Sequence, residues 1–104
     1  MTLLFKRQFL TKILWGQKTQ TRRLRHPHVT VGKSYRLSRG YRRIDQSIRI
    51  TDLFQQRLGD ITGDDIIKEG FDSPEEFKKA WAEIYGYYNP DILIWVVDFT
   101  LEKE

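Results

Sequence analysis

Residues 16–23 read Gly-Gln-Lys-Thr-Gln-Thr-Arg-Arg and stand at the end of a short apolar pattern. The apolar side chains before them recur with helical spacing at Phe9, Leu10, Ile13 and Leu14. This spacing predicts a short helix near residues 8–15, and Gly16 occupies the position where glycine commonly ends a helix. The polar residues that follow, two of them β-branched, predict a loop running into a strand.

Four further segments predict strands. Residues 2–5 are short and apolar, and we expect an opening strand there. Residues 33–38 and 47–54 alternate apolar with polar or basic side chains, as antiparallel strands with one buried face do. Residues 92–99 are apolar on both faces, which is typical of a central strand, and we expect Trp95 to lie in the core.

The C-terminal half also predicts two helices. The sequence Thr62-Gly63-Asp64-Asp65 provides a capping side chain and acidic residues for a helix that Gly70 ends. Residues 73–76 (Ser-Pro-Glu-Glu) predict a capping box, and the apolar stripe that follows includes Trp81, which we expect in the core. This helix ends at Gly86. Strands and helices in this order indicate an α+β fold with a curved antiparallel sheet or a small barrel.

Length and composition limit the class of protein. A chain of 104 residues suits one domain with a single core, and 39% hydrophobic with 31% charged residues suits a soluble globular protein. No apolar run approaches the roughly 20 residues that span a bilayer, so we expect no membrane association. The first residues become charged too early for a secretory signal, and we expect a cytoplasmic protein. Cysteine is absent, which excludes disulfides and thiolate metal sites.

The charges are segregated along the chain. Residues 1–58 carry 14 Lys or Arg against Asp45 and Asp52, whereas residues 59–104 carry 4 Lys or Arg against 12 Asp or Glu. This segregation indicates an electropositive surface that attracts polyanions such as RNA. The alternative is that the two halves neutralise each other in the folded chain, or form an ordinary solvated surface.

Three stretches in this order resemble the ASCH family, a group of PUA-like domains. Residues 16–22 (GQKTQTR) are similar to the family signature G-x-K-T-x-T-x-R, with Arg22 and Arg23 at the basic end. Residues 60–71 end in Glu-Gly-Phe, as the corresponding family helix does. The helix near 75–85 followed by the strand 94–99 is the third match. The likeness covers nearly the whole chain, so we expect residues 1–104 to form a single ASCH domain.

The resemblance implies a fold and a range of functions. The expected fold is a PUA-like small mixed or antiparallel β-barrel with flanking helices and a cleft beside residues 18–23. Most family members are proposed to bind RNA, often in translation or RNA modification. Some single-domain members are enzymes, including an amidohydrolase that acts on N4-acetylcytidine and a ribonuclease. Fold alone does not choose between these functions.

Lys18, Thr21 and Glu69 match the residues that the amidohydrolase members use. A threonine hydroxyl becomes a nucleophile when a base removes its proton, and burial beside Arg22 and Arg23 would favour the neutral lysine that can do this. Glu69 could orient the lysine, although its charge favours the protonated amine. On a regular strand Lys18 and Thr21 would point to opposite faces, so convergence requires irregular backbone. The structural alternative is a Lys18–Glu69 ion pair with Thr21 in a backbone hydrogen bond.

Arginines suggest a second binding surface. Arg36 alternates with apolar neighbours and is expected on the outer face of its strand. The segment Arg39-Gly40-Tyr41-Arg42-Arg43 predicts a basic hairpin tip that could grip a phosphate backbone and stack on a base, or could simply be a solvated loop. The candidate RNA- or ligand-binding residues are Lys18, Thr19, Thr21, Arg22, Arg23, Arg39, Tyr41, Arg42 and Arg43.

Other aromatic and histidine residues are weaker candidates. Trp15 could form the wall of a base-binding pocket or pack in the core. The loop containing Tyr87 and Tyr88 could border the cleft. His26 and His28 flank a proline, but no third ligand accompanies them, so we expect no metal and no cofactor. They fit a solvated loop, or acid–base roles in a ribonuclease.

The sequence favours a binding module for RNA, a nucleoside or a nucleotide. The alternative class is an enzyme, either an amidohydrolase on N4-acetylcytidine-like nucleosides using Lys18, Thr21 and Glu69, or a ribonuclease. A third possibility is an interaction domain with no role in nucleic-acid binding. The sequence identifies no protein partner.

Overall fold

The computed structural model describes the backbone of residues 2–39 and 42–102, and the side chains of residues 5–38 and 44–102. In this part of the chain five strands form one sheet: β1 (Thr2–Leu4), β2 (Gln20–Arg23), β3 (Ser34–Arg39), β4 (Arg42–Arg57) and β5 (Leu93–Glu102). The helices are α1 (Arg7–Leu14), α2 (Gly63–Lys68) and α3 (Pro74–Tyr85), and a short 3-10 turn spans Leu58–Asp60.

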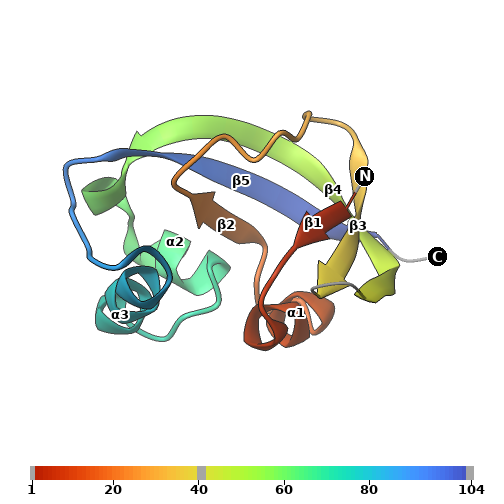
Figure 1. The fold of residues 1–104 in the computed structure, drawn as a ribbon, viewed down its shortest axis with the longest axis horizontal. Coiled ribbons are helices and arrows are strands. Elements are labelled where there is room, and N and C mark those ends of the chain that lie inside the picture. Colours follow the sequence, from red (N-terminus) through yellow and green to blue (C-terminus); the bar gives the residue numbers. More distant parts are fainter. Residues whose placement is uncertain (1, 40–41, 103–104) are drawn as a thin grey trace.

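The sheet is open. Its strand order is β1-β3-β4-β5-β2, with β1 parallel to β3 and every other neighbouring pair antiparallel. The long strands β4 and β5 curve across the molecule, and β2 lies beside β5 at one edge (Figure 1). The predicted α+β class, with its mixed and largely antiparallel sheet, is confirmed. The sheet is not closed into the expected barrel, because β1 and β2 are edge strands of the described sheet.

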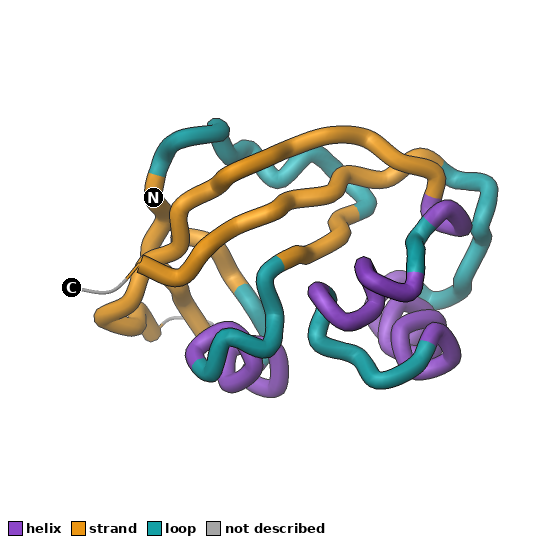
Figure 2. Tube along the Cα trace, turned by 180° about the vertical axis from the view of Figure 1, so that it is seen from behind, coloured by secondary structure: helices purple, strands orange, loops and turns teal. Residues whose placement is uncertain are grey.

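All three helices lie on the same side of the sheet (Figure 2). Helix α1 lies beneath the end of the sheet that holds β1 and β3, whereas α2 and α3 lie beneath the other end. The termini of the described chain lie together near the α1 end. This arrangement leaves the start of β2 between the two groups of helices.

The predicted helix ends are confirmed with one correction. Gly16 follows α1 with φ 76°, and Gly70 and Gly86 follow α2 and α3 in the same left-handed region. A capping box joins Thr62 and Asp65 at the start of α2. At α3 the Ser73 side chain accepts from the N–H of Glu76, but the Glu76 carboxylate accepts from the N–H of Asp72. The predicted capping box at α3 is therefore only half formed.

Two apolar clusters form the core. The first cluster lies between α1 and the sheet and includes Leu10, Leu37 and Ile48. The second lies between the sheet and helices α2 and α3 and includes Trp81 and Ile94. Strand β5 contributes to both clusters, because it runs the length of the sheet. Strand β5 therefore packs against both groups of helices through the two clusters.

The structure corrects three further expectations. Strand β4 extends beyond the predicted 47–54 at both ends, because pairing with β3 begins at Arg42 and pairing with β5 continues to Arg57. Trp81 is buried as predicted, but Trp95 is only partly buried and packs edge-on against His26 with ring centroids 4.5 Å apart. Trp15 is 79% exposed, so it neither packs in the core nor forms a pocket wall.

The hairpin expected at residues 39–43 lies partly outside the described residues, but the strands on either side of it pair. Arg39 at the end of β3 pairs with Arg42 at the start of β4. Tyr41 lies outside the described residues, and the side chains of Arg39, Arg42 and Arg43 do too. The proposed role of this hairpin in RNA binding stays a prediction.

Candidate functional site

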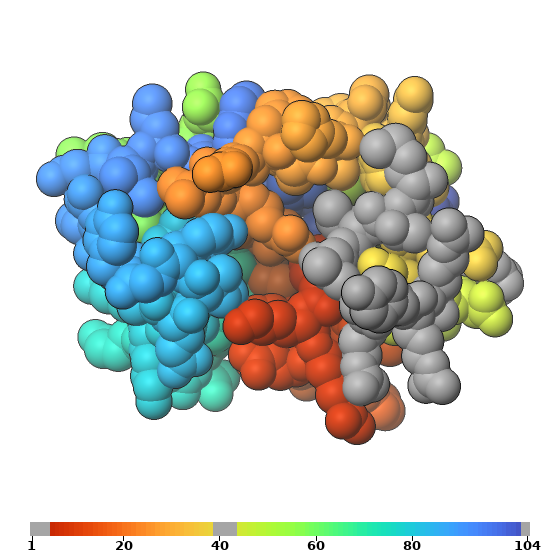
Figure 3. Space-filling model, in the orientation of Figure 1, coloured from red at the N-terminus to blue at the C-terminus, as the bar shows by residue number. Residues whose placement is uncertain are grey.

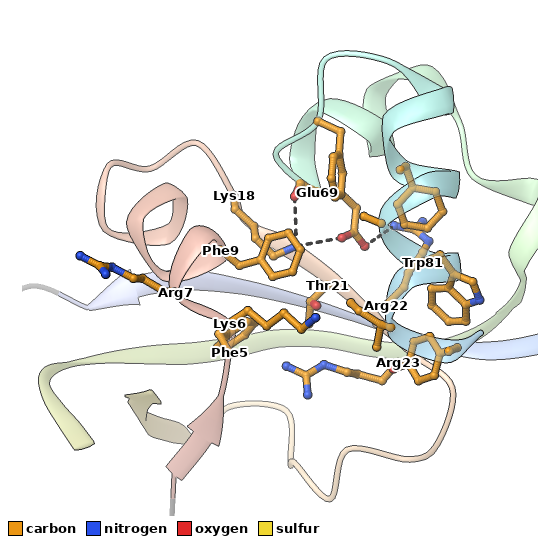
Figure 4. A pocket seen from close by; sticks show the side chains of 15 residues that line it. Phe5, Lys6, Arg7, Phe9, Lys18, Thr21, Arg22, Arg23, Glu69 and Trp81 are labelled. Atoms are coloured by element: carbon orange, nitrogen blue, oxygen red, sulfur yellow. Dashed lines mark hydrogen bonds and ion pairs between the residues drawn. The ribbon is translucent and has the colours of Figure 1, made fainter. Parts of the chain in front are cut away.

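Lys18 and Glu69 form a buried ion pair at the centre of the site. Lys18 Nζ donates to the Glu69 carboxylate Oε1 at 2.8 Å and to the Glu69 main-chain carbonyl at 3.0 Å. The two side chains are 2% and 4% exposed. Figure 4 shows Lys18, Thr21 and Glu69 reaching into the same space from different parts of the chain.

Irregular backbone before β2 explains how Lys18 and Thr21 converge. The N–H groups of Gln17 and Lys18 both donate to the carbonyl of Lys12, so the chain wraps tightly around the end of α1. The N–H of Thr19 then donates to the carbonyl of Lys68 at the end of α2. Regular strand geometry begins only at Gln20, so the objection from strand alternation does not apply to Lys18.

Arg22 is held behind the ion pair. Its Nη1 donates to Glu69 Oε2 at 3.1 Å and to the side chain of Gln20, and its Nη2 lies 3.2 Å from Asp65 Oδ2. Its Nε and Nη2 both donate to Gln56 Oε1. A guanidinium whose donors are committed in this way orients Glu69 and is not free to bind a phosphate.

Burial lowers the pKa of Lys18 from its usual value. The charge of Glu69 and its hydrogen bond oppose this shift, while the charges of Arg23 and Arg22 add to it. Burial decides the direction of the pKa shift, because Glu69 is shared between two cations and only partly compensates the buried amine. The site thus favours the neutral form of the Lys18 amine more than bulk solvent favours the neutral form of an exposed lysine.

Thr21 has a hydroxyl with no protein partner. The residue is 6% exposed, and its side chain makes no hydrogen bond within residues 2–39 and 42–102. The structural alternative, a Thr21 hydroxyl bonded to the backbone, is therefore not formed in the described chain. No fully buried side-chain N or O atom among the described residues lacks a partner, so the Thr21 hydroxyl reaches solvent and can bond to a ligand.

These groups line a cavity of about 450 Å³, the main pocket. It lies between α1 and α3, and the surface is hollowed where residues of α1, β2 and α3 meet (Figure 3). Its aromatic walls are Phe5, Phe9, Phe71, Phe77, Trp81 and Tyr85. Phe9, which packs on the first cluster, and Phe71, which packs on the second, contact each other edge-on with ring centroids 6.0 Å apart. Residues of both core clusters therefore line the pocket, which lies where the two clusters meet.

The main pocket is electropositive. Its basic lining residues are Lys6, Arg7, Lys18, Arg22 and Arg23. Glu69 is the one acidic residue among the described residues that line it. Arg23 lies over the Phe5 ring with its guanidinium carbon 4.9 Å from the ring centroid, and burial lowers the pKa of Arg23 from its usual value. A pocket of this charge attracts anionic or electron-rich ligands.

The structure brings together only part of the predicted set. Lys18, Thr21, Arg22, Arg23 and Glu69 all line the main pocket. Thr19 is exposed and stands outside the pocket lining. The loop residues Tyr87 and Tyr88 do not line it either, and Tyr88 instead packs against the second core cluster.

Sequence reasoning missed most of the aromatic walls and the basic rim. The stripe on α3 was interpreted as core alone, yet Phe77 and Trp81 are both core residues and pocket walls. One signal for the basic lining was present in the sequence at Lys6 and Arg7. Basic residues at the N-terminus of a helix interact unfavourably with the helix dipole, which suggests that an anion binds nearby. The α1 N-terminus also has no side-chain cap.

Two solved structures are similar to this chain. A crystal structure of an ASCH domain from Lactobacillus crispatus JV V101 superposes with a TM-score of 0.78 at 18% identity, covering 90% of this chain and 70% of that one. The chain has the ASCH-domain fold. Protein EF3133 of the DUF984 family from Enterococcus faecalis V583 gives a TM-score of 0.69 at 18% identity, over 90% of this chain and 69% of that one. The predicted ASCH resemblance is thereby confirmed at the level of the fold.

Sequence comparison adds nothing to the ASCH assignment. No family model matches the chain, and no curated protein matches it. Within residues 2–39 and 42–102, no three His, Asp or Glu side chains are grouped as ligands for a metal ion. None of the helices in this ASCH fold has the length and apolar character that a bilayer-spanning helix requires, as far as the described residues extend.

Proposed function

We propose that the main pocket binds a nucleoside or nucleotide, either free or as one unit of an RNA strand. The observation that carries this proposal is the combination of flat aromatic walls with Lys18, Thr21 and Glu69 in a cavity of about 450 Å³. Aromatic faces stack on bases, and convergent polar groups at the base of a pocket recognise a base edge. The ASCH fold agrees with this class of ligand.

Charge supports the same ligand class. Lys6, Arg7 and Arg23 surround the pocket, while Arg22 is committed to protein partners. A basic rim favours nucleotides over neutral small molecules. The wide arginine surface that polymeric RNA would require includes the residue 39–43 hairpin, whose contribution stays a prediction.

The test is a calorimetric titration with the four ribonucleosides, N4-acetylcytidine and their 5′-monophosphates. Thr21→Val removes the unpartnered hydroxyl with little change in shape, and Thr51→Val on the exposed face of β4 is the matched control. We expect Thr21→Val to weaken binding about tenfold, the effect of losing one good hydrogen bond to a ligand, and Thr51→Val to change nothing. Absence of binding by all of these ligands would refute the proposal.

A second candidate is hydrolysis of an N4-acylated cytosine. The supporting observation is that Thr21 has a free hydroxyl beside Lys18, whose pKa is lowered. Neutral Lys18 would take the Thr21 proton as Thr21 Oγ1 attacks the acyl carbon. The lysine proton would then pass to the departing base amine, and water would cleave the acyl ester to a carboxylate and free Thr21.

Turnover separates this candidate from simple binding. The protein is incubated with N4-acetylcytidine, and cytidine and acetate are measured together. Turnover that disappears in Thr21→Val and persists in Thr51→Val would establish the hydrolase. Tight binding without release of acetate would leave the pocket as a binding site for this compound.

A further inference from the structure

A second cavity of about 430 Å³ adjoins the main pocket. It is lined by Arg23, Leu24, Arg25, His26, Pro27 and Tyr85. Arg23 and Tyr85 line both cavities, so they stand at the junction. The Tyr85 hydroxyl accepts from the N–H of Leu24 at 3.4 Å, which links α3 to the loop that forms the second cavity.

The second cavity is basic without a balancing acid. Arg23, Arg25 and His26 line it, and no Asp or Glu does among the described residues. Arg25 is exposed and forms no ion pair or hydrogen bond in the described part of the chain. In the main pocket, by contrast, Glu69 already pairs with two cations. An anionic group that extends from a ligand in the main pocket into the second cavity would meet Arg25, which has no acidic partner among the described residues.

The His26 ring is held in a defined orientation. Its Nδ1 accepts from the N–H of His28 at 2.9 Å, and its ring packs edge-on against Trp95 at 4.5 Å. His28 has φ 57°, a left-handed conformation that is unfavourable for a non-glycine residue. Because Nδ1 accepts a hydrogen bond, the ring proton of neutral His26 is on Nε2, which can donate to a ligand oxygen.

We propose that the second cavity binds the phosphate group attached to the nucleoside that the main pocket holds. This inference rests on the proposed function of the main pocket. Arg25 provides charge-assisted N–H donors and the His26 ring provides a further N–H, and a phosphate presents several acceptor oxygens to them. The phosphate belongs either to a mononucleotide or to the backbone of an RNA strand, and both sources use the same contacts.

The experiment compares each ribonucleoside with its 5′- and 3′-monophosphates by calorimetry. The variants are Arg25→Gln and His26→Gln, and Arg36→Gln is the matched control, since Arg36 is exposed on β3 and lines neither cavity. In the wild type and in Arg36→Gln we expect one monophosphate to bind about tenfold more tightly than its nucleoside. Arg25→Gln should remove most of this advantage, and His26→Gln part of it, with nucleoside affinity unchanged.

A short oligonucleotide of the same base distinguishes the two sources of phosphate. If the natural ligand is an RNA strand, the oligonucleotide binds more tightly than the monophosphate. Arg25→Gln then lowers the slope of log affinity against log salt concentration by about 0.7. If the natural ligand is a mononucleotide, the oligonucleotide binds no more tightly than the monophosphate.

The outcomes that overturn the inference are separate from those that overturn the proposed function. If nucleosides bind but the phosphate adds no affinity, or its advantage survives in both Arg25→Gln and His26→Gln, the second cavity is not a phosphate site and the main pocket still stands. If no nucleoside and no nucleotide binds, both proposals are wrong.

Discussion

The Glu69 carboxylate accepts from Lys18 at one oxygen and from Arg22 at the other. All three side chains are nearly inaccessible to water. Removing the acid leaves two buried cations without their shared counter-charge. In a buried ion pair, loss of one partner is far more costly than the pair itself is stabilising.

Glu69→Gln should therefore lower the free energy of unfolding by about 3–5 kcal/mol, measured by urea denaturation at neutral pH. Glu83→Gln on the exposed face of α3 is the control and should change it by less than about 0.5 kcal/mol. Equal stability of the Glu69→Gln variant and the wild type would show that the Lys18–Glu69–Arg22 cluster is not formed as described.

At the scale of residues, sequence and resemblance together could predict that Lys18, Thr21 and Glu69 lie near one another. They could not predict that Arg22 is committed to protein partners. Gln20 lies two residues away on the same strand, but Gln56 of β4 and Asp65 of α2 are remote in sequence and carry no local signal. Long-range hydrogen bonds of this kind become visible only in the folded chain.

Helix α2 and its ends hold the acidic side of the site. Gly70, just after α2, has φ 89°, and a Cβ there would lie 3.0 Å from Lys12 Cδ and 3.4 Å from Lys18 Cβ. Gly32 has the same φ, but a Cβ there would meet nothing within 4 Å. Comparing alanine substitutions at the two glycines therefore distinguishes the free-energy cost of the left-handed backbone from the cost of steric contact with neighbouring atoms.

Gly32→Ala should lower the free energy of unfolding by about 1–2 kcal/mol, the cost of a left-handed non-glycine residue. Gly70→Ala should lower it further, because the added Cβ would also crowd the Lys12 side chain. Both free energies are measured by urea denaturation. Equal losses in the two variants would mean that Gly70 does not pack closely against Lys12.

The first turn of α2 makes acid stability depend on Asp65. Partial burial opposes ionisation of Asp65, but hydrogen bonds with Thr62 and the charges of Arg22 and Lys68 outweigh it, so its pKa is lowered. The unfolded chain then binds more protons than the native chain at acidic pH, and stability rises with pH there. This contribution is complete above the unfolded pKa of about 3.9 and is lost as pH falls through the lower folded value.

Asp65→Asn should therefore be less stable than the wild type at pH 7, with a difference that shrinks as the pH falls below about 4. The measurement is a series of urea denaturation curves from neutral to acidic pH, with Asp64→Asn as the exposed neighbouring control. A difference that does not change with pH would exclude an electrostatic role for Asp65.

At the scale of elements, local signals predicted the helix ends well, because caps and glycines act within a few residues. They underestimated β4. A register shift between Ile50 and Asp52 interrupts the alternation of apolar side chains, so the pattern weakens before the strand ends. Pairing with β5, which is remote in sequence, extends β4 to Arg57.

In the whole molecule the two oppositely charged halves of the chain meet. Buried pairs join Lys18 and Arg22 to Glu69, and exposed pairs include Arg49 with Glu102 and Arg57 with Asp91. The alternative in which the halves neutralise each other is therefore realised in part. Part of the basic character that remains lines the main pocket and the second cavity.

The overall architecture could be predicted from the order of elements and the ASCH resemblance, whereas its open sheet could not. Closure depends on whether the edge strands β1 and β2 pair, and the sequence of each gives no signal about its missing neighbour. The resemblance implied a cleft beside residues 18–23, but not that residues of two separate core clusters would line it. That residues 1–104 form a single domain stays a prediction.

The most direct test of the central claim is an NMR titration of the 15N-labelled protein with the ribonucleosides and their monophosphates. We predict saturable amide shifts at Lys18–Arg23, which lead into and form β2, and at Glu69–Phe71, which follow α2. Amides near Arg36 and Arg49 on the outer face of the sheet should not move. Shifts confined to that outer face, or no shifts with any of these ligands, would contradict a nucleoside- or nucleotide-binding pocket between the helices.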